Sequence, residues 1–526
     1  MAAALEVETT KTPGHQARNQ DLVSWCLGGS LHWLRRHPDL AAVSLLLLVG
    51  GALRLGLAFR APPFFVGGDS QTYLVPGYEL ARGLGFSPIL KRPPLYPAFI
   101  GAAIGGLGED LHGLALAQHA LGLVTVVLTY HLGRVALNRA AGLVAGLLVA
   151  VNGPLMIYER YVMAETLFTT LLVAASLALV VGMRRASWPF YALGGLLLGL
   201  ATLCRPAAEL LLPVVPAVSL VWHRKFGVAA RLCGAGLAGF ALIALPWIAL
   251  TYLESGSFGS SGLGEALFWR GTRESPILIG REIGRPADVA DPLRQAARRL
   301  AYQRAVDEEL PSDIAVLLQQ RFGVSEAQAD GVLRDVALEL FARQPGRYVQ
   351  TSFGLFGELL VGTEQWLGGQ GKSGGLRRYP NPQDKYGDWW DERIRQLAQP
   401  PSEAESNEFR NAQAITGLYQ PYRYATLSLA LLGCGLLGAM LVPGWRAALL
   451  PALMALWLLL STAFLSGALP RYRYPADPLL AVVIGAGVVG LVLAARELPR
   501  TIRRAAPNSA SAPTPTRTSP SATVGR

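Results

Sequence analysis

The feature that most constrains this chain is a series of long, uninterrupted apolar runs. Several of them reach the roughly 17–25 residues that an α-helix needs to cross a lipid bilayer. Charged residues make up only 16% of the 526 residues, whereas soluble domains average roughly 25%. Inside a bilayer, a helix satisfies its own backbone hydrogen bonds. The sequence therefore predicts an all-α polytopic membrane protein.

We expect about ten transmembrane helices. Their predicted bounds are Leu40–Phe59, Leu114–Leu132, Ala140–Met156, Val162–Val181, Phe190–Cys204, Ala208–Trp222, Leu232–Tyr252, Tyr424–Leu441, Ala447–Leu465 and Ala476–Ala495. One set of short connections carries basic residues, among them Arg134, Arg139 and Lys225, and almost no acids. Basic residues favour the cytoplasmic side. Both termini are therefore expected in the cytoplasm.

The spans divide the chain into five parts. They are an amphipathic cytoplasmic N-terminus (1–39), a seven-span module (40–252) whose first outer loop is 60–113, an outer loop domain (253–423), a three-span module (424–495) and a basic, disordered cytoplasmic tail (496–526). In the first outer loop we expect a helix over Tyr73–Arg82 and an interfacial helix over 94–106. In the outer loop domain, Ser325 and Gln328 predict a capping box that opens a helix, and the apolar segment Arg347–Gly362 is expected to lie along the outer surface.

The stretch FFVGGDSQTY places Asp69 after two glycines, in a segment that we expect to be a loop at the outer face. A carboxylate there suits the attack of a hydroxyl or amine on a sugar attached to a lipid phosphate, because the acid can accept the nucleophile's proton. Lys91 and Arg92 follow in the same loop and can neutralise a departing phosphate. The local sequence leaves a second interpretation open, in which Asp69 caps the next helix and the two cations anchor the segment at the interface.

Five stretches occur in order along the chain: GGDSQTY, RPPLYP, ERYVMAETLF, GLLLGLATLCRP and PRYRYP. Together with the predicted topology they resemble the GT-C superfamily of membrane glycosyltransferases, in particular the protein O-mannosyltransferases and the lipid A aminoarabinose transferases. The resemblance implies a multi-span fold with its active site at the outer membrane face. It also implies a polyprenyl-phosphate-linked sugar as donor.

The resemblance assigns roles to individual residues. It implies that Asp69 is the catalytic base and that Glu165 is a second catalytic acid. It implies further that outer basic residues hold the donor phosphate, for which the candidates are Lys91, Arg92, Arg471 and Arg473. Candidate substrate contacts are Tyr73, Glu159, Arg160, Arg205 and Tyr472.

Several of these roles have a structural alternative. The pair Arg471 and Arg473 also fits a cationic and aromatic belt at the interface. For Arg205, a role in holding helix ends is as well supported as substrate contact, and we expect it to pair with Glu209. Arg54, inside the first span, is expected either to snorkel or to pair internally and not to bind substrate.

We predict no required cofactor. Some GT-C members bind divalent cations, but His112 and His119 are seven residues apart, so no histidine pair supports a metal site. The expected partners are a polyprenyl-phosphate sugar donor, an acceptor whose identity stays open among protein, lipid and glycan, and the bilayer; no nucleic acid is expected. The composition suggests the inner (plasma) membrane of a bacterium. A transporter or flippase of lipid-linked glycans and a polysaccharide ligase are the alternatives.

Overall fold

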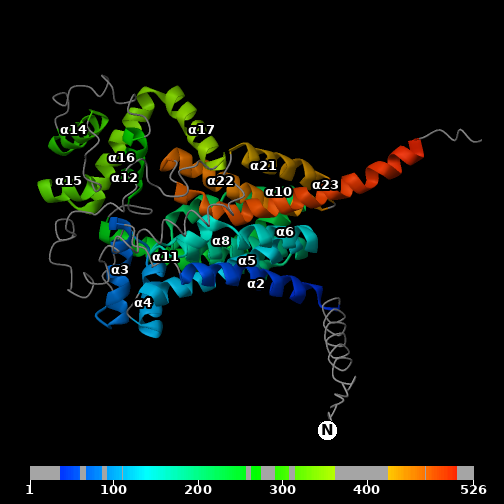
Figure 1. The fold of residues 1–526 in the computed structure, drawn as a ribbon. Coiled ribbons are helices and arrows are strands. Elements are labelled where there is room, and N and C mark those ends of the chain that lie inside the picture. Colours follow the sequence, from blue (N-terminus) through cyan, green and yellow to red (C-terminus); the bar gives the residue numbers. More distant parts are fainter. Residues whose placement is uncertain are drawn as a thin grey trace, which may run out of the picture.

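The structure is a computed structural model of the chain. It describes residues 36–59, 67–85, 92–108, 111–255, 262–273, 291–306, 314–361, 425–442, 444–467 and 470–505. Every regular element in these ranges is a helix, and most of the helices run side by side as one bundle (Figure 1). The prediction of an all-α polytopic membrane protein is therefore confirmed. The predicted amphipathic N-terminus and most of the tail lie outside the described residues.

Seven segments of the described chain are long and apolar enough to cross a membrane. They are α2 (Pro38–Ala58), α5 (Leu111–Ala136), α8 (Glu165–Arg185), η1 (Pro206–Leu211) with α10 (Val214–His223), α11 (Phe226–Ser255), η5 (Trp445–Ala448) with α22 (Leu449–Leu465), and η7 (Tyr474–Ala476) with α23 (Asp477–Ala505). The other three predicted spans correspond to shorter helices: α6 (Arg139–Ala150) with α7 (Gly153–Tyr158), α9 (Trp188–Thr202) and α21 (Ala425–Met440). The predicted count of ten is therefore not confirmed.

The predicted third span, Ala140–Met156, consists of two helices instead of one. Asn152 separates α6 from α7, and its side-chain Oδ1 accepts a hydrogen bond from the backbone N–H of Leu155 at 3.2 Å. Pro154 follows within the first turn of α7, where the missing N–H of proline costs nothing. The Asn-Gly-Pro sequence thus restarts the helix, and the prediction of one continuous span was wrong.

Glycines allow the apolar helices to approach each other closely, as is common in membrane bundles. A Cβ atom at Gly195 on α9 would lie 1.8 Å from the carbonyl oxygen of Gly236 on α11. A Cβ atom at Gly490 on α23 would lie at the same distance, 1.8 Å, from the carbonyl oxygen of Gly438 on α21. At both crossings the two backbones are in contact.

The first outer loop contains the two expected helices, α3 (Gly67–Ala81) and α4 (Leu95–Leu107). The helix predicted over Tyr73–Arg82 begins earlier than expected, so Asp69 lies in the first turn of α3 and not in a loop. The two glycines before Asp69 belong to the helix. A carboxylate in a first turn is favoured by the helix dipole, so Asp69 lies inside the start of the helix that the second interpretation had it cap.

A second group of helices forms what we call the outer domain. It comprises α12 (Leu263–Arg273), α14 (Pro292–Val306), α15 (Ile314–Phe322), α16 (Glu326–Arg343) and α17 (Pro345–Val361). Phe268, Leu318 and Leu333 lie in its own hydrophobic cluster, separate from that of the bundle. The predicted capping box is confirmed, with both hydrogen bonds between Ser325 and Gln328 present. The segment predicted to lie along the surface is the helix α17.

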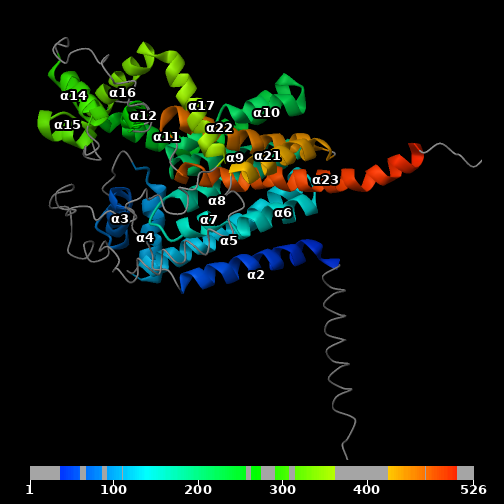
Figure 2. The ribbon, with the colours of Figure 1, turned by 45° about the horizontal axis from the view of Figure 1, so that its top comes forward.

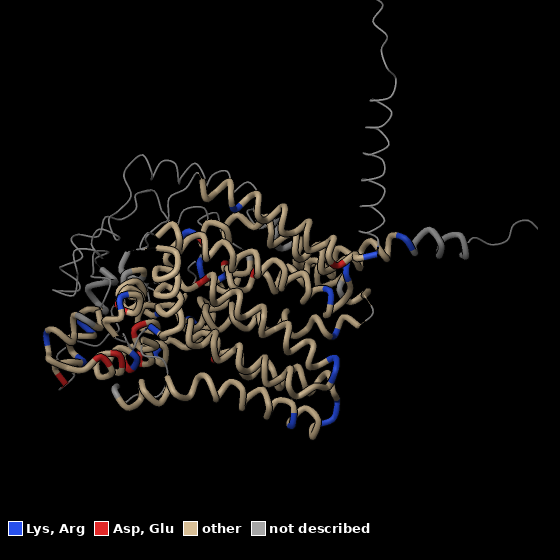
Figure 3. Tube along the Cα trace, turned by 90° about the horizontal axis from the view of Figure 1, so that it is seen from below, with Lys and Arg blue, Asp and Glu red and all other residues tan. Residues whose placement is uncertain are grey.

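The outer domain lies at the same end of the bundle as α3 and α4 (Figure 2). At the opposite end, where α23 leaves the bundle, Lys and Arg residues gather with few acidic residues among them, whereas Asp and Glu residues lie mostly toward the outer domain, where they are mixed with Arg (Figure 3). At the basic end, Asp39 forms ion pairs with Arg134 at 3.0 Å and Arg139 at 2.9 Å. This arrangement agrees with the charge asymmetry on which the predicted orientation rests.

Candidate active site

The candidate site forms around an ion pair between Glu165 and Arg205. Glu165 is the first residue of α8, where the helix dipole favours a carboxylate. Arg205 follows the end of α9 in an extended conformation, which the next residue, Pro206, favours. A guanidinium N–H of Arg205 donates to Glu165 Oε1. The Glu165 side chain is 2% exposed and that of Arg205 is 20% exposed, so the arginine forms the accessible side of the pair.

Two aromatic rings and a second arginine surround Arg205. Its guanidinium carbon lies 5.6 Å from the centre of the Tyr472 ring and 6.0 Å from that of Phe168. Tyr472 ends the short helix η6 (Pro470–Tyr472). Arg471 lies over the same ring at 5.5 Å. Tyr472 therefore contacts two guanidinium groups, which are attracted to its electron-rich face.

The first outer loop reaches the same place. The side chain of Arg92 donates to Thr72 Oγ1 at 2.9 Å, and its guanidinium carbon lies 4.9 Å from the centre of the Tyr73 ring. Tyr73 is close enough to Arg205 for the two groups to interact electrostatically. We call Arg92, Arg205 and Arg471, with Tyr73, Tyr472 and Glu165, the basic cluster.

The charge of Arg205 is secured by its neighbours. Burial alone would lower its pKa, but the carboxylate of Glu165 outweighs this effect, and the pKa of Arg205 is raised. The guanidinium therefore stays cationic at every physiological pH. The Arg205 guanidinium is partly exposed and permanently charged, and its planar set of N–H donors is suited to bind phosphate or carboxylate oxygens.

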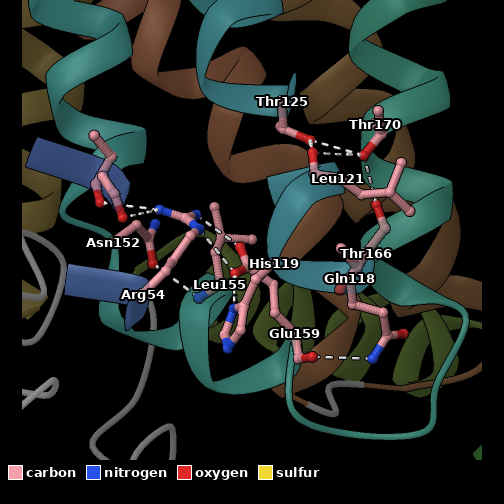
Figure 4. A network of polar contacts seen from close by, with 12 residues as sticks. Arg54, Gln118, His119, Leu121, Thr125, Asn152, Leu155, Glu159, Thr166 and Thr170 are labelled. Carbon is pink, nitrogen blue, oxygen red and sulfur yellow. Dashed lines mark hydrogen bonds and ion pairs between the residues drawn. The ribbon is translucent and has the colours of Figure 1, made fainter. Parts of the chain in front are cut away.

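Glu159 lies deeper, in a separate network at the centre of the bundle (Figure 4). Arg54 donates to both of its carboxylate oxygens, from Nε to Oε2 at 2.8 Å and from Nη2 to Oε1 at 2.7 Å. His119 Nδ1 lies 2.6 Å from Oε2. All three side chains are buried. Of the two roles expected for Arg54, internal pairing is therefore confirmed.

A small cavity separates this network from the basic cluster. Its volume is about 20 Å³, and Glu159, Glu165, Thr125 and Tyr158 are among the residues that line it. A cavity of this size holds about one water molecule. Glu165 Oε2 is buried and has no hydrogen-bond partner among the described residues, so a water at this position would satisfy it.

Arg473 is fully buried and makes contacts within the protein. It donates to Asp477 Oδ1 at 2.8 Å and to the carbonyl oxygens of Leu359 at 3.1 Å and Leu360 at 2.5 Å. Asp477 also accepts a hydrogen bond from Asn152 at 3.2 Å. These contacts tie the turn that carries Arg471 and Tyr472 to the end of α17 and to the break between α6 and α7.

The remaining predicted residues are placed less completely. For Asp69 the structure describes the backbone in α3 but not the side chain, and Lys91 lies outside the described residues. Arg160 is buried, and burial lowers its pKa to about 10. Arg205 pairs with Glu165, so the prediction that Arg205 pairs with Glu209 was wrong.

Two residues of this region were not singled out from the sequence. Tyr96 on α4 donates its hydroxyl to Gln118 Oε1 on α5 at 2.8 Å, and both side chains are buried. Gln118 was detectable as an amide inside the apolar run predicted to span the membrane, because polar groups at that depth need a partner. Tyr96 belongs to the quoted motif RPPLYP.

Among the described residues, no three His, Cys, Asp or Glu side chains gather into a group able to hold a metal ion. The side chain of Asp69 is not among those described. The absence of a required metal stays a prediction.

Known proteins resemble the chain in sequence over one segment. Residues 91–249 match the family model described as dolichyl-phosphate-mannose-protein mannosyltransferase. The matched segment includes Arg92, Glu165 and Arg205, whereas Asp69 and Arg471 lie outside it. No curated protein sequence matches the chain.

Solved structures resemble the chain more distantly. The archaeal oligosaccharyltransferase AglB from Archaeoglobus fulgidus, in complex with an inhibitory peptide and a dolichol-phosphate, is 14% identical with a TM-score of 0.46, and the match covers 90% of this chain and 52% of AglB. ArnT from Cupriavidus metallidurans bound to undecaprenyl phosphate is 15% identical with a TM-score of 0.34, covering 89% of this chain and 80% of ArnT. The chain thus spans about half the length of the oligosaccharyltransferase. Over residues 91–249, the chain is similar in sequence to membrane mannosyltransferases that use a dolichyl-phosphate donor.

Proposed function

We propose that this protein is a membrane glycosyltransferase that moves a sugar from a polyprenyl-phosphate donor to an acceptor at the extracytoplasmic face. The observation that carries the proposal is the basic cluster, to which three separate parts of the chain each contribute an arginine. Arg205 and Arg471 lie over the same ring, that of Tyr472, and Arg92 lies over the ring of Tyr73, which interacts with Arg205. A phosphate attached to a lipid is the substrate group that such a cluster recognises best, because forked guanidinium groups pair with phosphate oxygens.

In this mechanism the acceptor displaces the phosphate directly. Asp69 accepts the proton of the acceptor's hydroxyl or amine as the new bond to the sugar forms. The bond between the sugar and the phosphate oxygen breaks at the same time, and the cluster stabilises the charge that grows on the leaving phosphate. A single displacement inverts the configuration of the sugar carbon. Lys91 and Asp69, whose side chains are not described, complete the proposed site.

Within the site we assign different tasks to the acidic and basic groups. Glu165 holds Arg205 in place and keeps it charged. Arg471 is half-buried and is proposed as a phosphate ligand together with Arg92 and Arg205. Arg473 was also predicted to bind phosphate, but its described bonds go to Asp477 and two carbonyl oxygens. We propose that Arg473 instead supports the turn that carries Arg471.

Other assignments of the sequence-based prediction remain part of the proposal. We place the protein in the inner (plasma) membrane of a bacterium with both termini in the cytoplasm. Tyr73 and Tyr472, which belong to the basic cluster, remain candidate substrate contacts. The buried network around Glu159 and the buried Arg160 favour structural roles for these two residues.

The test is transfer by the purified protein in liposomes supplied with a polyprenyl-phosphate sugar and an acceptor extract. Asp69→Asn should lower kcat by about 10²–10⁴-fold without changing the thermal unfolding temperature, while the matched control on the same helix, Glu79→Gln, should keep wild-type activity. Arg471→Gln should raise the KM for the donor. Near-full transfer by Asp69→Asn would remove the proposed base.

The same liposomes separate the alternatives. A flippase or transporter would move the intact lipid-linked sugar between leaflets without transferring it. The wild-type protein and Asp69→Asn would then both form no transfer product. A polysaccharide ligase would transfer a whole glycan in place of a single sugar, which mass spectrometry of the product distinguishes.

A further inference from the structure

One buried amide joins the part of the chain that carries the proposed base, Asp69, to the part that carries Glu165, the carboxylate that holds Arg205. Gln118 lies on α5, between the first outer loop and the connection from α7 to α8. Its Nε2 donates to the carbonyl oxygen of Glu159 at 3.0 Å (Figure 4). The same Nε2 donates to the carbonyl oxygen of Tyr161 at 2.8 Å, and Oε1 accepts the Tyr96 hydroxyl at 2.8 Å. Gln118 is 1% exposed and Tyr96 is fully buried. Water therefore cannot replace these bonds without entering the core.

The link continues toward Asp69 on one side. The rings of Tyr96 and Tyr73 meet edge to face, with centres 5.1 Å apart. Tyr73 follows Asp69 by one turn of α3. The start of α4 is also fixed, because Leu95 N donates to the carbonyl oxygen of Leu203 at 2.9 Å, two residues before Arg205. The position of α3 and α4 is thus tied to Gln118 and to the end of α9.

The link continues toward Glu165 on the other side. The connection from α7 to α8 has backbone hydrogen bonds of its own, from Tyr161 N to the carbonyl oxygen of Tyr158 at 3.1 Å and from Met163 N to that of Tyr161 at 2.9 Å. Gln118 adds two bonds from outside the connection, to the carbonyl oxygens of Glu159 and Tyr161. The Tyr96 hydroxyl also interacts with the backbone of Met163. Glu165 begins α8 directly after this connection, and Cys204 Sγ contacts the carbonyl oxygen of Ala164 at 3.4 Å. The place of Glu165 therefore depends on how the connection is held.

We infer that Gln118 is a positioning residue that fixes the segment carrying Asp69 relative to the segment carrying Glu165 and its partner Arg205. The inference rests on the proposed function. Only an amide fits the place, because one end must accept a hydroxyl proton while the other donates to two carbonyl oxygens. A carboxylate would face two carbonyl oxygens, and an apolar side chain would remove the bonds to the Tyr96 hydroxyl and to both carbonyl oxygens at once.

The first experiment compares Gln118→Leu, Tyr96→Phe and the double variant in the liposome transfer assay. Gln118→Leu should lower kcat by about 10²-fold, the order expected when reacting groups shift by about 1 Å, with little change in the donor KM. Tyr96→Phe should have a smaller effect, and the double variant should be no worse than Gln118→Leu, since the two residues act through one bond. Thr129→Val is the matched control on α5, because Thr129 is buried and its hydroxyl donates only to the carbonyl oxygen of Thr125 within its own helix.

The second experiment does not need activity. In a protein with Cys26, Cys233 and Cys434 replaced by serine, the rate at which a small maleimide labels Cys204 reports how well the connection is held. At a temperature at which both proteins are fully folded, Gln118→Leu should speed labelling roughly tenfold, as expected for a local opening, and Thr129→Val should not.

The outcomes separate the two proposals. If the wild-type protein transfers no sugar, the proposed function fails while the labelling still tests the link. If transfer occurs and Gln118→Leu retains wild-type kcat and wild-type labelling, the positioning role is overturned. Additive losses in the double variant, or an equal kcat loss in Thr129→Val, would overturn it as well.

Discussion

At the scale of single residues, the centre of the bundle depends on a glycine. A Cβ atom at Gly122 would lie 1.9 Å from Glu159 Oε1, so only glycine leaves room for the carboxylate that Arg54 and His119 hold. Buried ion pairs need such geometry, because each charge loses its hydration and must recover the cost from its partners. The glycine, the carboxylate and the two bases therefore form one unit.

We predict that breaking this unit on one side is costly. Arg54→Met leaves the Glu159 carboxylate buried without its main partner and should lower the free energy of unfolding by about 3–5 kcal/mol. Arg54→Met combined with Glu159→Leu should recover much of the loss, because no unpaired charge remains. The measurement is thermal unfolding in detergent. A double variant that is less stable than Arg54→Met would contradict the ion-pair interpretation.

A second prediction at this scale concerns pH and the outer domain. Burial raises the pKa of Glu339, but hydrogen bonds from Arg298 and Arg343 outweigh burial, and the pKa is lowered below its usual value of 4.5. The ionised form is thus the one that the fold stabilises. This stabilisation is fully present above pH 4.5 and is lost as the pH falls through the lowered pKa.

The check is a comparison of wild-type protein with Glu339→Gln during acid titration. The unfolding temperature of the wild-type outer domain should fall more steeply below about pH 4.5 than that of the variant, because only the wild type has this carboxylate to protonate. Parallel curves for the two proteins would show that Glu339 contributes nothing to the pH dependence.

Residue-level predictions from the sequence were accurate where the residue's own position in an apolar run was enough to predict that it needs a partner. The internal pairing of Arg54 followed from its place in an apolar run. The partner of Arg205 did not follow, because Glu209 is near it in sequence, whereas Glu165 is brought to it by the packing of α8 against α9. The three hydrogen bonds of Gln118 join three separate segments, namely α4, α5 and the connection from α7 to α8, and no sequence period encodes such contacts.

At the scale of elements, the close contact between α21 and α23 allows a direct test of the helix packing. A Cβ atom at Gly438 would lie 2.2 Å from the carbonyl oxygen of Gly487, whereas a Cβ atom at Gly433 on the same helix meets nothing within 4 Å. The two glycines therefore form a matched pair, one in the contact and one outside it.

We predict that Gly438→Ala separates the two helices and lowers the free energy of unfolding by about 1–3 kcal/mol. Gly433→Ala should be neutral or slightly stabilising, because alanine is the better helix former. Thermal unfolding of both variants in the same detergent decides the matter. Equal effects at the two positions would mean that α21 does not pack on α23 as the structure has it.

Element boundaries could be predicted where a local signal marks them. The capping box at Ser325 and the apolar helix of α4 were both read from short patterns. The break at Asn152 and the early start of α3 were missed. Asn152 lies inside an apolar run, and its capacity to cap a helix was not used. α3 begins at two glycines, which are poor helix formers, so the helix was expected only from Tyr73. The seven long spans were all anticipated. Of the three shorter ones, the predicted third span is divided into α6 and α7, whereas α9 and α21 are single helices.

At the scale of the whole molecule, the arrangement of charge predicts the orientation in the membrane. Single cysteines in a cysteine-free background should distinguish the two faces. Gly108→Cys after α4 and Leu338→Cys on α16 should label with a membrane-impermeant maleimide on intact cells, whereas Lys225→Cys between α10 and α11 should label only after the membrane is opened. The prediction follows from the basic end facing the cytoplasm. The reverse pattern would invert the topology and place the basic cluster on the inner side.

The grip of Arg473 on the end of α17 has a mechanical consequence. α17 is held near its start as well, because the Tyr348 hydroxyl donates to the carbonyl oxygen of Phe464 at 2.8 Å. Because α17 is held near both ends, a displacement of this helix would also displace the turn that carries Arg473. Tyr472 lies in that turn, so the ring that contacts Arg205 and Arg471 would shift as well.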